Sequence, residues 1–222
     1  EFGLIMISVI IRTRNEARWI GHAIQSILDN FPNDETEIKI LDNESDDETL
    51  QIVKMFKEFN LEIITIPRLE YTPGRALNVG LNSTSSESKI SCIMSAHCAV
   101  ERINLDLLQQ HMEDRRCFGI MGKQIPIFKG KRLASSYVWE NFTGNKVLQN
   151  LRENDKLFFH NAFSFINMDV WRENRFNEEL TGKEDREWAD RLYQKDFHFL
   201  YDPAQRCFHH WTESCATWNG MG

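Results

Sequence analysis

The sequence predicts an α/β protein built on an open, mainly parallel sheet with helices on both faces. In the first hundred residues, apolar β-branched segments alternate with segments whose apolar residues recur every three or four positions. The length of 222 residues and the hydrophobic content of 41% are also sufficient for a sizeable core. Alternation of strands and helices produces right-handed units whose strands run parallel in one sheet.

The first half is predicted to contain four strands and three helices. Leu4–Ile11 is continuously apolar, which is typical of a strand covered on both faces. Glu16–Asn30 carries one apolar stripe and predicts a helix. The elements that follow are a strand at Glu37–Asp42, a helix opened by a capping box at Ser45–Glu48, a strand at Leu61–Pro67, a short helix from Pro73 through Leu81 and a strand at Lys89–Ala96.

The second half resumes this alternation only in part. We expect a strand at Ile120–Phe128 that leads into a mobile segment around Phe128–Arg132. Aromatic residues are concentrated in Leu157–Trp171, and Glu184–Leu192 reads as a helix with acidic residues in its first turn. Phe197–Asp202 is the last predicted strand.

Composition excludes several classes of function. The net charge of -7 argues against a sequence-independent grip on nucleic acid, which requires Lys and Arg against the phosphates. The five cysteines, Cys92, Cys98, Cys117, Cys207 and Cys215, are widely spaced without a C-x-x-C pair, so we expect neither a disulfide framework nor a zinc knuckle. We expect a reducing, cytoplasmic location, because the sequence offers no membrane span and no signal peptide.

Ligands of open parallel sheets bind beyond the carboxyl ends of the strands. The segments at these ends are Arg12–Glu16, Asp42–Ser45, Arg68–Arg75 and Ser95–His97. The two glycine-rich phosphate loops, G-x-G-x-x-G and G-x-x-x-x-G-K-[ST], are absent from the sequence. A nicotinamide-dependent dehydrogenase and a P-loop enzyme are therefore disfavoured.

Seven segments occur in a characteristic order: VIIRTRNEARWIGHAIQSIL, ILDNESDDET, TPGRALNVGLNST, IMSAHCAV, FFHNAFSFI, GKEDREWADRL and YDPAQRCFHHW. This ordered set, from about Ile7 to Trp211, resembles the family-two glycosyltransferases of the GT-A fold, and most of all the bacterial enzymes that assemble surface polysaccharides. The resemblance implies one domain over residues 1–222, with a nucleotide-binding half at about 4–100 and an acceptor and catalytic half at about 101–222. Many relatives continue beyond Trp211, so a C-terminal segment is expected to be missing.

The resemblance implies an inverting glycosyltransferase. It would move a sugar from a nucleotide-diphosphate sugar to a hydroxyl of a saccharide or lipid-linked saccharide, in cell-envelope or capsular polysaccharide synthesis. Peripheral association with the inner face of the membrane fits this role. The alternative is a GT-A-like protein that binds nucleotide sugar or glycan without turnover. A sugar-phosphate nucleotidyltransferase is disfavoured, because such enzymes have a glycine-rich first loop where this chain has RTRNE.

Strand-end residues are implied to hold the nucleotide. In the family, the loop after the first strand and the aspartate that ends the second strand bind base and ribose, and a residue at the position of Arg75 faces the phosphates. The implied set is Thr13, Arg14, Glu16, Asp42, Arg75 and Ser95. A carboxylate can accept hydrogen bonds from an imide N–H or a ribose hydroxyl. The residues alone also allow Asp42 to cap a helix and Arg75 to be a solvated surface residue.

The fourth strand raises the question of a metal ion. Most metal-dependent members of the family have Asp-x-Asp there, and this chain has Ser95-Ala96-His97. A divalent cation is compatible with an imidazole in the case of Mn²⁺ and less so for Mg²⁺. The resemblance implies that His97 and His209 could form a metal pair. Catalysis without metal, in which His97 and arginines stabilise the diphosphate directly, and a core histidine without a role are the alternatives.

Glu184 and Asp185 are the candidate catalytic acids. An inverting transfer needs a base that takes the proton of the acceptor hydroxyl, and the family's Glu-Asp motif supplies it, usually through the aspartate. Asp185 is thus the implied base, and Glu184 is a neighbour that orients the acceptor. His160 and Asn161 resemble the segment near the donor and acceptor sugars. Acidic residues at a helix N-terminus without any function are the alternative.

Overall fold

The computed structural model describes residues 6–133, 137–213 and 218. Leu4 and Ile5 of the predicted first strand, and Cys215, lie outside these residues. The strands are β1 (Ile7–Thr13), β2 (Thr36–Asp42), β3 (Leu61–Thr65), β4 (Ile90–Ser95), β5 (Cys98–Arg102), β6 (Cys117–Phe128), β7 (Lys131–Arg132), β8 (Leu148–Gln149), β9 (Arg152–Glu153), β10 (Lys156–Leu157), β11 (Phe163–Asn167) and β12 (His198–His210). The α-helices are α1 (Ile20–Asn30), α2 (Thr49–Val53), α3 (Pro73–Asn82), α4 (Leu105–Met112), α5 (Met168–Glu173) and α6 (Glu184–Tyr193).

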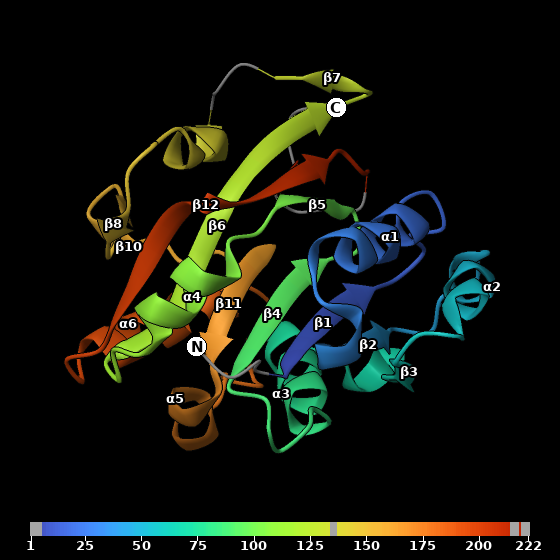
Figure 1. Cartoon of the computed structure of the whole chain (residues 1–222), viewed down its shortest axis with the longest axis horizontal. Helices are drawn as coiled ribbons and strands as arrows, with labels where there is room; N and C mark the ends of the chain where they lie inside the picture. Colours follow the sequence, from blue (N-terminus) through green and yellow to red (C-terminus); the bar gives the residue numbers. More distant parts are fainter. Residues whose placement is uncertain (1–5, 134–136, 214–217, 219–222) are drawn as a thin grey trace.

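One large sheet organises the molecule, with the strand order β3-β2-β1-β4-β11-β6-β12-β5. The first four strands in this order run parallel, as do β6 and β12. β11 lies antiparallel between β4 and β6, and β5 pairs antiparallel with β12. The predicted α/β class with a mainly parallel sheet is confirmed, and the antiparallel strands β5 and β11 both follow the four parallel strands β1 to β4 in the chain (Figure 1).

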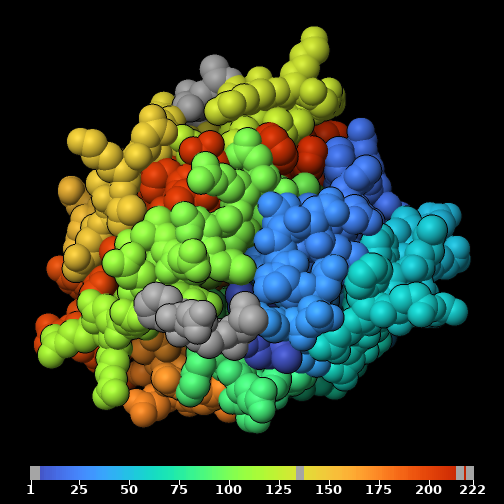
Figure 2. Space-filling view, viewed as in Figure 1, coloured from blue at the N-terminus to red at the C-terminus, as the bar shows by residue number. Residues whose placement is uncertain are grey.

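The sheet separates two hydrophobic cores, because successive side chains of a strand point to opposite faces. In β1, Val9 and Ile11 pack with α1, α2 and α4, whereas Ile10 packs with α3 on the other side. The second core also contains Trp171 of α5 and Trp188 of α6. Helices therefore cover both faces, and Figure 2 shows the face that α1 and α4 form.

The predicted capping box at Ser45–Glu48 is wrong. α2 begins only at Thr49, and Glu48 makes no side-chain capping bond. Instead, the Ser45 hydroxyl accepts a hydrogen bond from the Asn15 backbone N–H at 3.0 Å, and Asp47 Oδ2 accepts one from the Ala17 N–H at 3.1 Å. The polar side chains that looked like a local cap are used to join two loops, which a sequence pattern cannot distinguish from capping.

Other boundaries also differ from the prediction. α1 begins at Ile20, four positions after the predicted start, and β5 and α4 were not predicted. The segment expected to be mobile forms a hairpin in which β7 pairs with the end of β6, with Lys129 and Gly130 at positive φ in the turn. The last strand runs on to His210, so that both terminal histidines lie on β12.

Among the described residues, no helix is both long and apolar enough to cross a membrane. The cysteines in the described part of the chain, Cys92, Cys98, Cys117 and Cys207, are buried and are not joined in disulfides with one another. Burial raises the pKa of the Cys117 thiol to about 12, so this thiol is protonated at neutral pH.

Gly74 permits a close approach between α3 and the segment that follows α5. A Cβ atom at this position would overlap the backbone carbonyl of Asn177. Gly74→Ala is expected to lower the free energy of unfolding by about 1–3 kcal/mol, because backbone has to move to relieve the overlap. Chemical denaturation measures the loss. Gly182→Ala is the matched control, since its Cβ would meet nothing within 4 Å; equal stability of the two variants would contradict the prediction.

Candidate active site

A cavity of ≈ 980 Å³ opens at the carboxyl ends of β1 and β4, beside the N-terminus of α6. Its lining includes five residues predicted from the sequence, namely Ser95, His97, His160, Glu184 and Asp185. Arg12, at the end of β1, and the β9–β10 hairpin complete much of the wall. The strand-end rule thus located the cavity, and the α6 acids reach it from the second half of the chain.

Asp185 is held firmly at the edge of this cavity. Its Oδ2 accepts a hydrogen bond from the Asn161 backbone N–H at 3.1 Å, and its Oδ1 accepts one from the Arg186 N–H at 2.8 Å. Loss of water around the carboxyl raises the pKa of Asp185, although the two N–H groups and the cations of Arg12 and Arg186 act in the opposite direction. The group is oriented and able to take a proton.

Glu184 lines the same cavity and forms an ion pair with Arg12. Its Oε1 accepts a hydrogen bond from Arg12 Nη1 at 3.0 Å, and its side chain is 6% exposed. Burial acts to lower the pKa of Arg12, but Glu184, Tyr71 and Asp185 together raise it, so the guanidinium stays charged. This ion pair fastens the start of α6 to the end of β1.

His160 lines the cavity, whereas the side chain of Asn161 does not. His160 stacks on Phe158 with ring centroids 5.8 Å apart. Burial, followed by repulsion from Arg186, lowers the pKa of His160 to about 4, which makes the ring neutral. The buried side-chain oxygen of Asn161 accepts from the Ser164 hydroxyl at 2.9 Å, so Asn161 reaches the site through its backbone contact with Asp185.

A pair of imidazoles lies at the ends of β4 and β12. The ring centroids of His97 and His209 are 5.0 Å apart. His97 Nδ1 contacts Glu16 Oε1 at 2.9 Å, and His209 Nδ1 contacts Gln124 Oε1 at 2.8 Å. Burial, with the neighbouring His97, holds the pKa of His209 well below its usual value. The structure therefore brings His97, His209 and Glu16 together.

The Nε2 atom of His209 is buried and makes no hydrogen bond with any described residue. The Nδ1 atoms of both rings contact a carboxylate or amide oxygen, as the non-coordinating nitrogen of a metal-binding histidine usually does. Among the residues that the structure describes, no cluster of three or more His, Cys, Asp and Glu side chains could hold a metal ion. Within the described ranges, the imidazole pair of His97 and His209 is thus not accompanied by a third such side chain in a metal-binding arrangement.

The remaining predicted nucleotide-binding residues lie outside the lining of the cavity. Thr13 and Asp42 are partners in the β1–β2 register, and the Thr13 hydroxyl is buried without a hydrogen bond to any described residue. Asp42 accepts from the Ser45 N–H, Arg14 is exposed, and Arg75 forms an exposed ion pair with Glu70.

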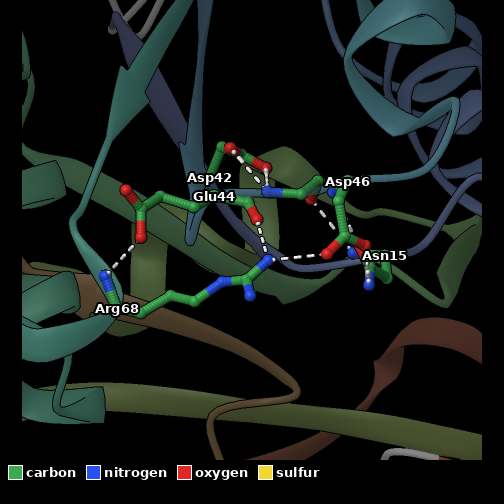
Figure 3. Close-up of polar contacts among 6 residues, drawn as sticks. Asn15, Asp42, Glu44, Asp46 and Arg68 are labelled. Atoms are coloured by element: carbon green, nitrogen blue, oxygen red, sulfur yellow. Dashed lines mark hydrogen bonds and ion pairs between the residues drawn. The ribbon is translucent and has the colours of Figure 1, made fainter.

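A polar network holds the loops after β1, β2 and β3 (Figure 3). Arg68 Nη2 donates to Asp46 Oδ2 at 2.9 Å and to the Glu44 carbonyl at 2.6 Å. Asn15 Nδ2 donates to Asp46 Oδ1 at 2.8 Å, and the Asp46 N–H donates back to Asn15 Oδ1. Asp42 lies between these loops. The hydrogen bonds of the network fix the shape of this end of the sheet.

Sequence reasoning missed three residues that shape the site: Arg12, Arg186 and Gln124. Arg12 had a signal, since it stands at the carboxyl end of a predicted strand. Arg186, which pairs with Glu153 of the hairpin at 3.1 Å, follows directly after the Glu-Asp pair. Gln124 had none, because it lies within a strand and not at the carboxyl end of one.

Comparison with known proteins gives consistent results. The family model described as "Glycosyl transferase family 2" matches residues 8–175. Over 86 residues, or 38% of the chain and 15% of the relative, the sequence is 31% identical to the poly(ribitol-phosphate) beta-N-acetylglucosaminyltransferase TarS of Staphylococcus aureus.

Among solved structures, TarS 1–349 in complex with UDP-GlcNAc is similar with a TM-score of 0.74 and 19% identity, over 97% of this chain and 61% of that one. GalNAc-T7 with UDP, GalNAc and Mn²⁺ has a TM-score of 0.72 and 16% sequence identity, over 96% of this chain and 45% of that one. A mannosyltransferase from Pyrobaculum calidifontis in complex with GDP-Man and Mn²⁺ has a TM-score of 0.70 and 17% sequence identity, over 96% of this chain and 59% of that one. The chain thus shares their GT-A fold and spans less than two thirds of each.

Proposed function

Since this chain belongs to glycosyl transferase family 2, we propose that it transfers a sugar from a nucleotide-diphosphate sugar to the hydroxyl of an acceptor, with inversion at the anomeric carbon. One observation carries the proposal: a carboxylate with a raised pKa, Asp185, is fixed by two backbone N–H groups at the wall of a cavity of ≈ 980 Å³. A desolvated, oriented carboxylate is suited to remove the proton of a hydroxyl group.

The proposed reaction is a single displacement. The acceptor oxygen attacks the anomeric carbon from the face opposite the diphosphate, and its proton passes to Asp185. A bond forms between this oxygen and the carbon, while the bond from the carbon to the diphosphate oxygen breaks. The nucleoside diphosphate leaves with the electron pair. Glu184 acts through Arg12 by holding the start of α6, and His160 is placed to bind a sugar hydroxyl.

The nucleotide half of the proposed site is the parallel end of the sheet, within residues 4–100. Thr13, Arg14, Glu16, Asp42, Arg75 and Ser95 remain the proposed nucleotide-binding set. The buried hydroxyl of Thr13 beside Asp42 supports this role: it has no hydrogen-bond partner in the part of the chain that the structure describes, and a buried polar group normally has one. Uridine and guanosine diphosphates are the first candidates, since TarS was solved with UDP-GlcNAc and the Pyrobaculum enzyme with GDP-Man.

A divalent cation fits the imidazole pair. His97 and His209 would hold it, since their Nδ1 atoms contact Glu16 and Gln124, and the buried Nε2 atom of His209 has no hydrogen-bond partner among the described residues. Imidazole ligands favour Mn²⁺ over Mg²⁺. When bound, such an ion supplies positive charge to the leaving diphosphate. Two of the solved relatives contain Mn²⁺.

The proposed acceptor is a saccharide or lipid-linked saccharide of the cell envelope or capsule. TarS, whose name states that it modifies poly(ribitol-phosphate), supports this setting. We further propose that residues 101–222 supply the acceptor side, and that the protein works in the cytoplasm at the inner face of the membrane. A binding protein without turnover is the second candidate, and the absence of Asp-x-Asp in the sequence favours it.

Nucleotide binding tests the donor half of the proposal. We expect one of UDP, GDP, dTDP and CMP at 100 times its Kd to stabilise the protein by about 2.7 kcal/mol. This corresponds to a rise in melting temperature of about 5–10 °C for a chain of this size. The effect should be larger with Mn²⁺ than with chelator, and larger than with Mg²⁺. A panel in which no nucleotide raises the melting temperature would contradict the proposed function.

A further inference from the structure

Gln124 lies between two of the histidines at the site. It lies on β6 and is 1% exposed. Its Nε2 contacts His160 Nδ1 at 3.0 Å, and its Oε1 contacts His209 Nδ1 at 2.8 Å. One buried amide therefore connects an imidazole that lines the cavity with an imidazole of the His97–His209 pair.

Backbone geometry decides which way this amide is oriented. The Ala162 N–H lies 3.4 Å from His160 Nδ1 and donates to it, so this nitrogen carries a lone pair. A carbonyl oxygen facing the same nitrogen would place two acceptors against each other. The NH₂ group of Gln124 therefore faces His160, and its carbonyl oxygen faces His209. Because that oxygen only accepts, His209 Nδ1 must carry the proton.

The protonation of Nδ1 also determines the protonation of Nε2 in each ring. A neutral imidazole has one N–H and one lone pair, so His209 presents a lone pair at Nε2, and His160 presents an N–H there. The two rings thus have opposite chemistry at the same position. His209 can bind a cation or accept a hydrogen bond, whereas His160 can donate to a sugar hydroxyl or a phosphate oxygen.

We propose that Gln124 is a positioning residue that sets the tautomers of His160 and His209, and so prepares an acceptor at one end of the site and a donor at the other. The roles of these two nitrogens in binding donor and cation rest on the proposed function; the tautomers themselves do not. A glutamine suits this task because its amide has a donor and an acceptor side by side, and strand β6 is fixed between β11 and β12.

Long-range ¹H–¹⁵N correlation spectra test the tautomers without any substrate. In the wild-type protein, the spectrum should show His209 protonated at Nδ1 and His160 protonated at Nε2, with each ring assigned from the spectrum of its His→Asn variant. A spectrum in which His209 is protonated at Nε2, or His160 at Nδ1, would overturn the proposal even if the protein proved to be an active glycosyltransferase.

Gln124→Glu separates the two halves of the amide. A carboxylate can still accept from His209 Nδ1 but cannot donate to His160, so His209 should keep its tautomer while His160 gains a proton on Nδ1. Gln124→Met removes both contacts: His209 should lose its single tautomer, whereas His160, which keeps only the longer contact with the Ala162 N–H at 3.4 Å, should show a smaller excess of the Nε2–H form than the wild type. Unchanged spectra in both variants would refute the proposal; where the methionine variant does not fold, the glutamate variant and the wild-type spectrum decide.

Gln205→Met is the matched control. Gln205 is also fully buried, but its amide is bonded to Asn104 and Asp202, outside the cavity lining. Mn²⁺ titration should show about 10- to 100-fold weaker binding in Gln124→Met, the usual effect of removing a second-shell partner, and wild-type binding in Gln205→Met. The spectra could show the expected tautomers while neither Mn²⁺ nor any nucleotide binds. That result would support Gln124 as the residue that sets the tautomers and would count only against the proposed function.

Discussion

Asp185→Asn is expected to lower kcat for sugar transfer by about 10²- to 10⁴-fold, which is the usual contribution of a general base. Asparagine keeps the shape of the side chain and one acceptor for the N–H groups of Asn161 and Arg186, but it cannot take a proton. The Kd for the donor nucleotide should change little, because the variant loses a group that acts on the acceptor. Release of the nucleoside diphosphate, measured with the nucleotide that raises the melting temperature, gives the rate.

The pH dependence of the wild-type rate tests the role of Asp185 independently. Desolvation raises the pKa of Asp185, so the base is protonated and inactive over a wider acidic range than an ordinary aspartate would be. The rate should fall as the pH is lowered through this raised pKa, and the acidic limb of kcat/KM should lie above the usual range of aspartate. In Asp185→Asn this limb should be absent from the residual activity.

Asp190→Asn is the matched control for this experiment. Asp190 lies on the same helix, α6, but is exposed and does not line the cavity. The same removal of one carboxylate should leave kcat within the error of the measurement. Equal rates for wild type and Asp185→Asn would exclude Asp185 as the base, and equal losses in both variants would point to the charge of the helix rather than to proton transfer.

Arg12→Met is expected to produce the largest loss of stability. The substitution leaves the carboxylate of Glu184, 6% exposed, without its cation, and breaking a buried pair from one side costs about 3–5 kcal/mol. For a chain of this length, such a loss lowers the melting temperature by roughly 6–20 °C. Differential scanning calorimetry or chemical denaturation measures the effect.

A double-mutant cycle separates the pair from the size of the side chain. Combining Arg12→Met with Glu184→Gln removes both charges, and the double variant should be more stable than Arg12→Met alone, since no unpaired carboxylate stays behind. Arg191→Met is the control, because its ion pair with Glu187 on the same helix is about one-third exposed and should contribute only about 0.3–0.5 kcal/mol. Equal losses for Arg12→Met and Arg191→Met would contradict the assignment of a buried pair.

The location of the site followed from local patterns. The first strands were recognised from apolar runs, and the strand-end segments of Arg12–Glu16 and Ser95–His97 were thereby placed at one edge of the sheet. The start of α6 at Glu184 was visible in its acidic first turn. These features are local, because hydrophobic period and helix-end chemistry depend on neighbouring residues of the chain.

Local sequence patterns did not predict the hydrogen bonds and ion pairs that side chains form with distant segments. Ser45 and Asp42 looked like part of a helix start, but Ser45 accepts from Asn15, and Asp42 holds the Ser45 N–H. The ion pair of Glu184 with Arg12, 172 positions earlier, was likewise not predicted from its own segment. Such pairings depend on which strands become neighbours, and no spacing within a segment encodes them.

By itself, the sequence determined the class of the fold, the edge of the sheet where the cavity opens and the acidic pair at the head of α6. Tertiary structure alone decided the insertion of β11 between β4 and β6, the burial of Glu184 against Arg12 and the bridge that Gln124 makes between His160 and His209. The physical reason is range: periodicity reports which face of a segment is buried, whereas hydrogen bonds and ion pairs require the distant partner to be in place.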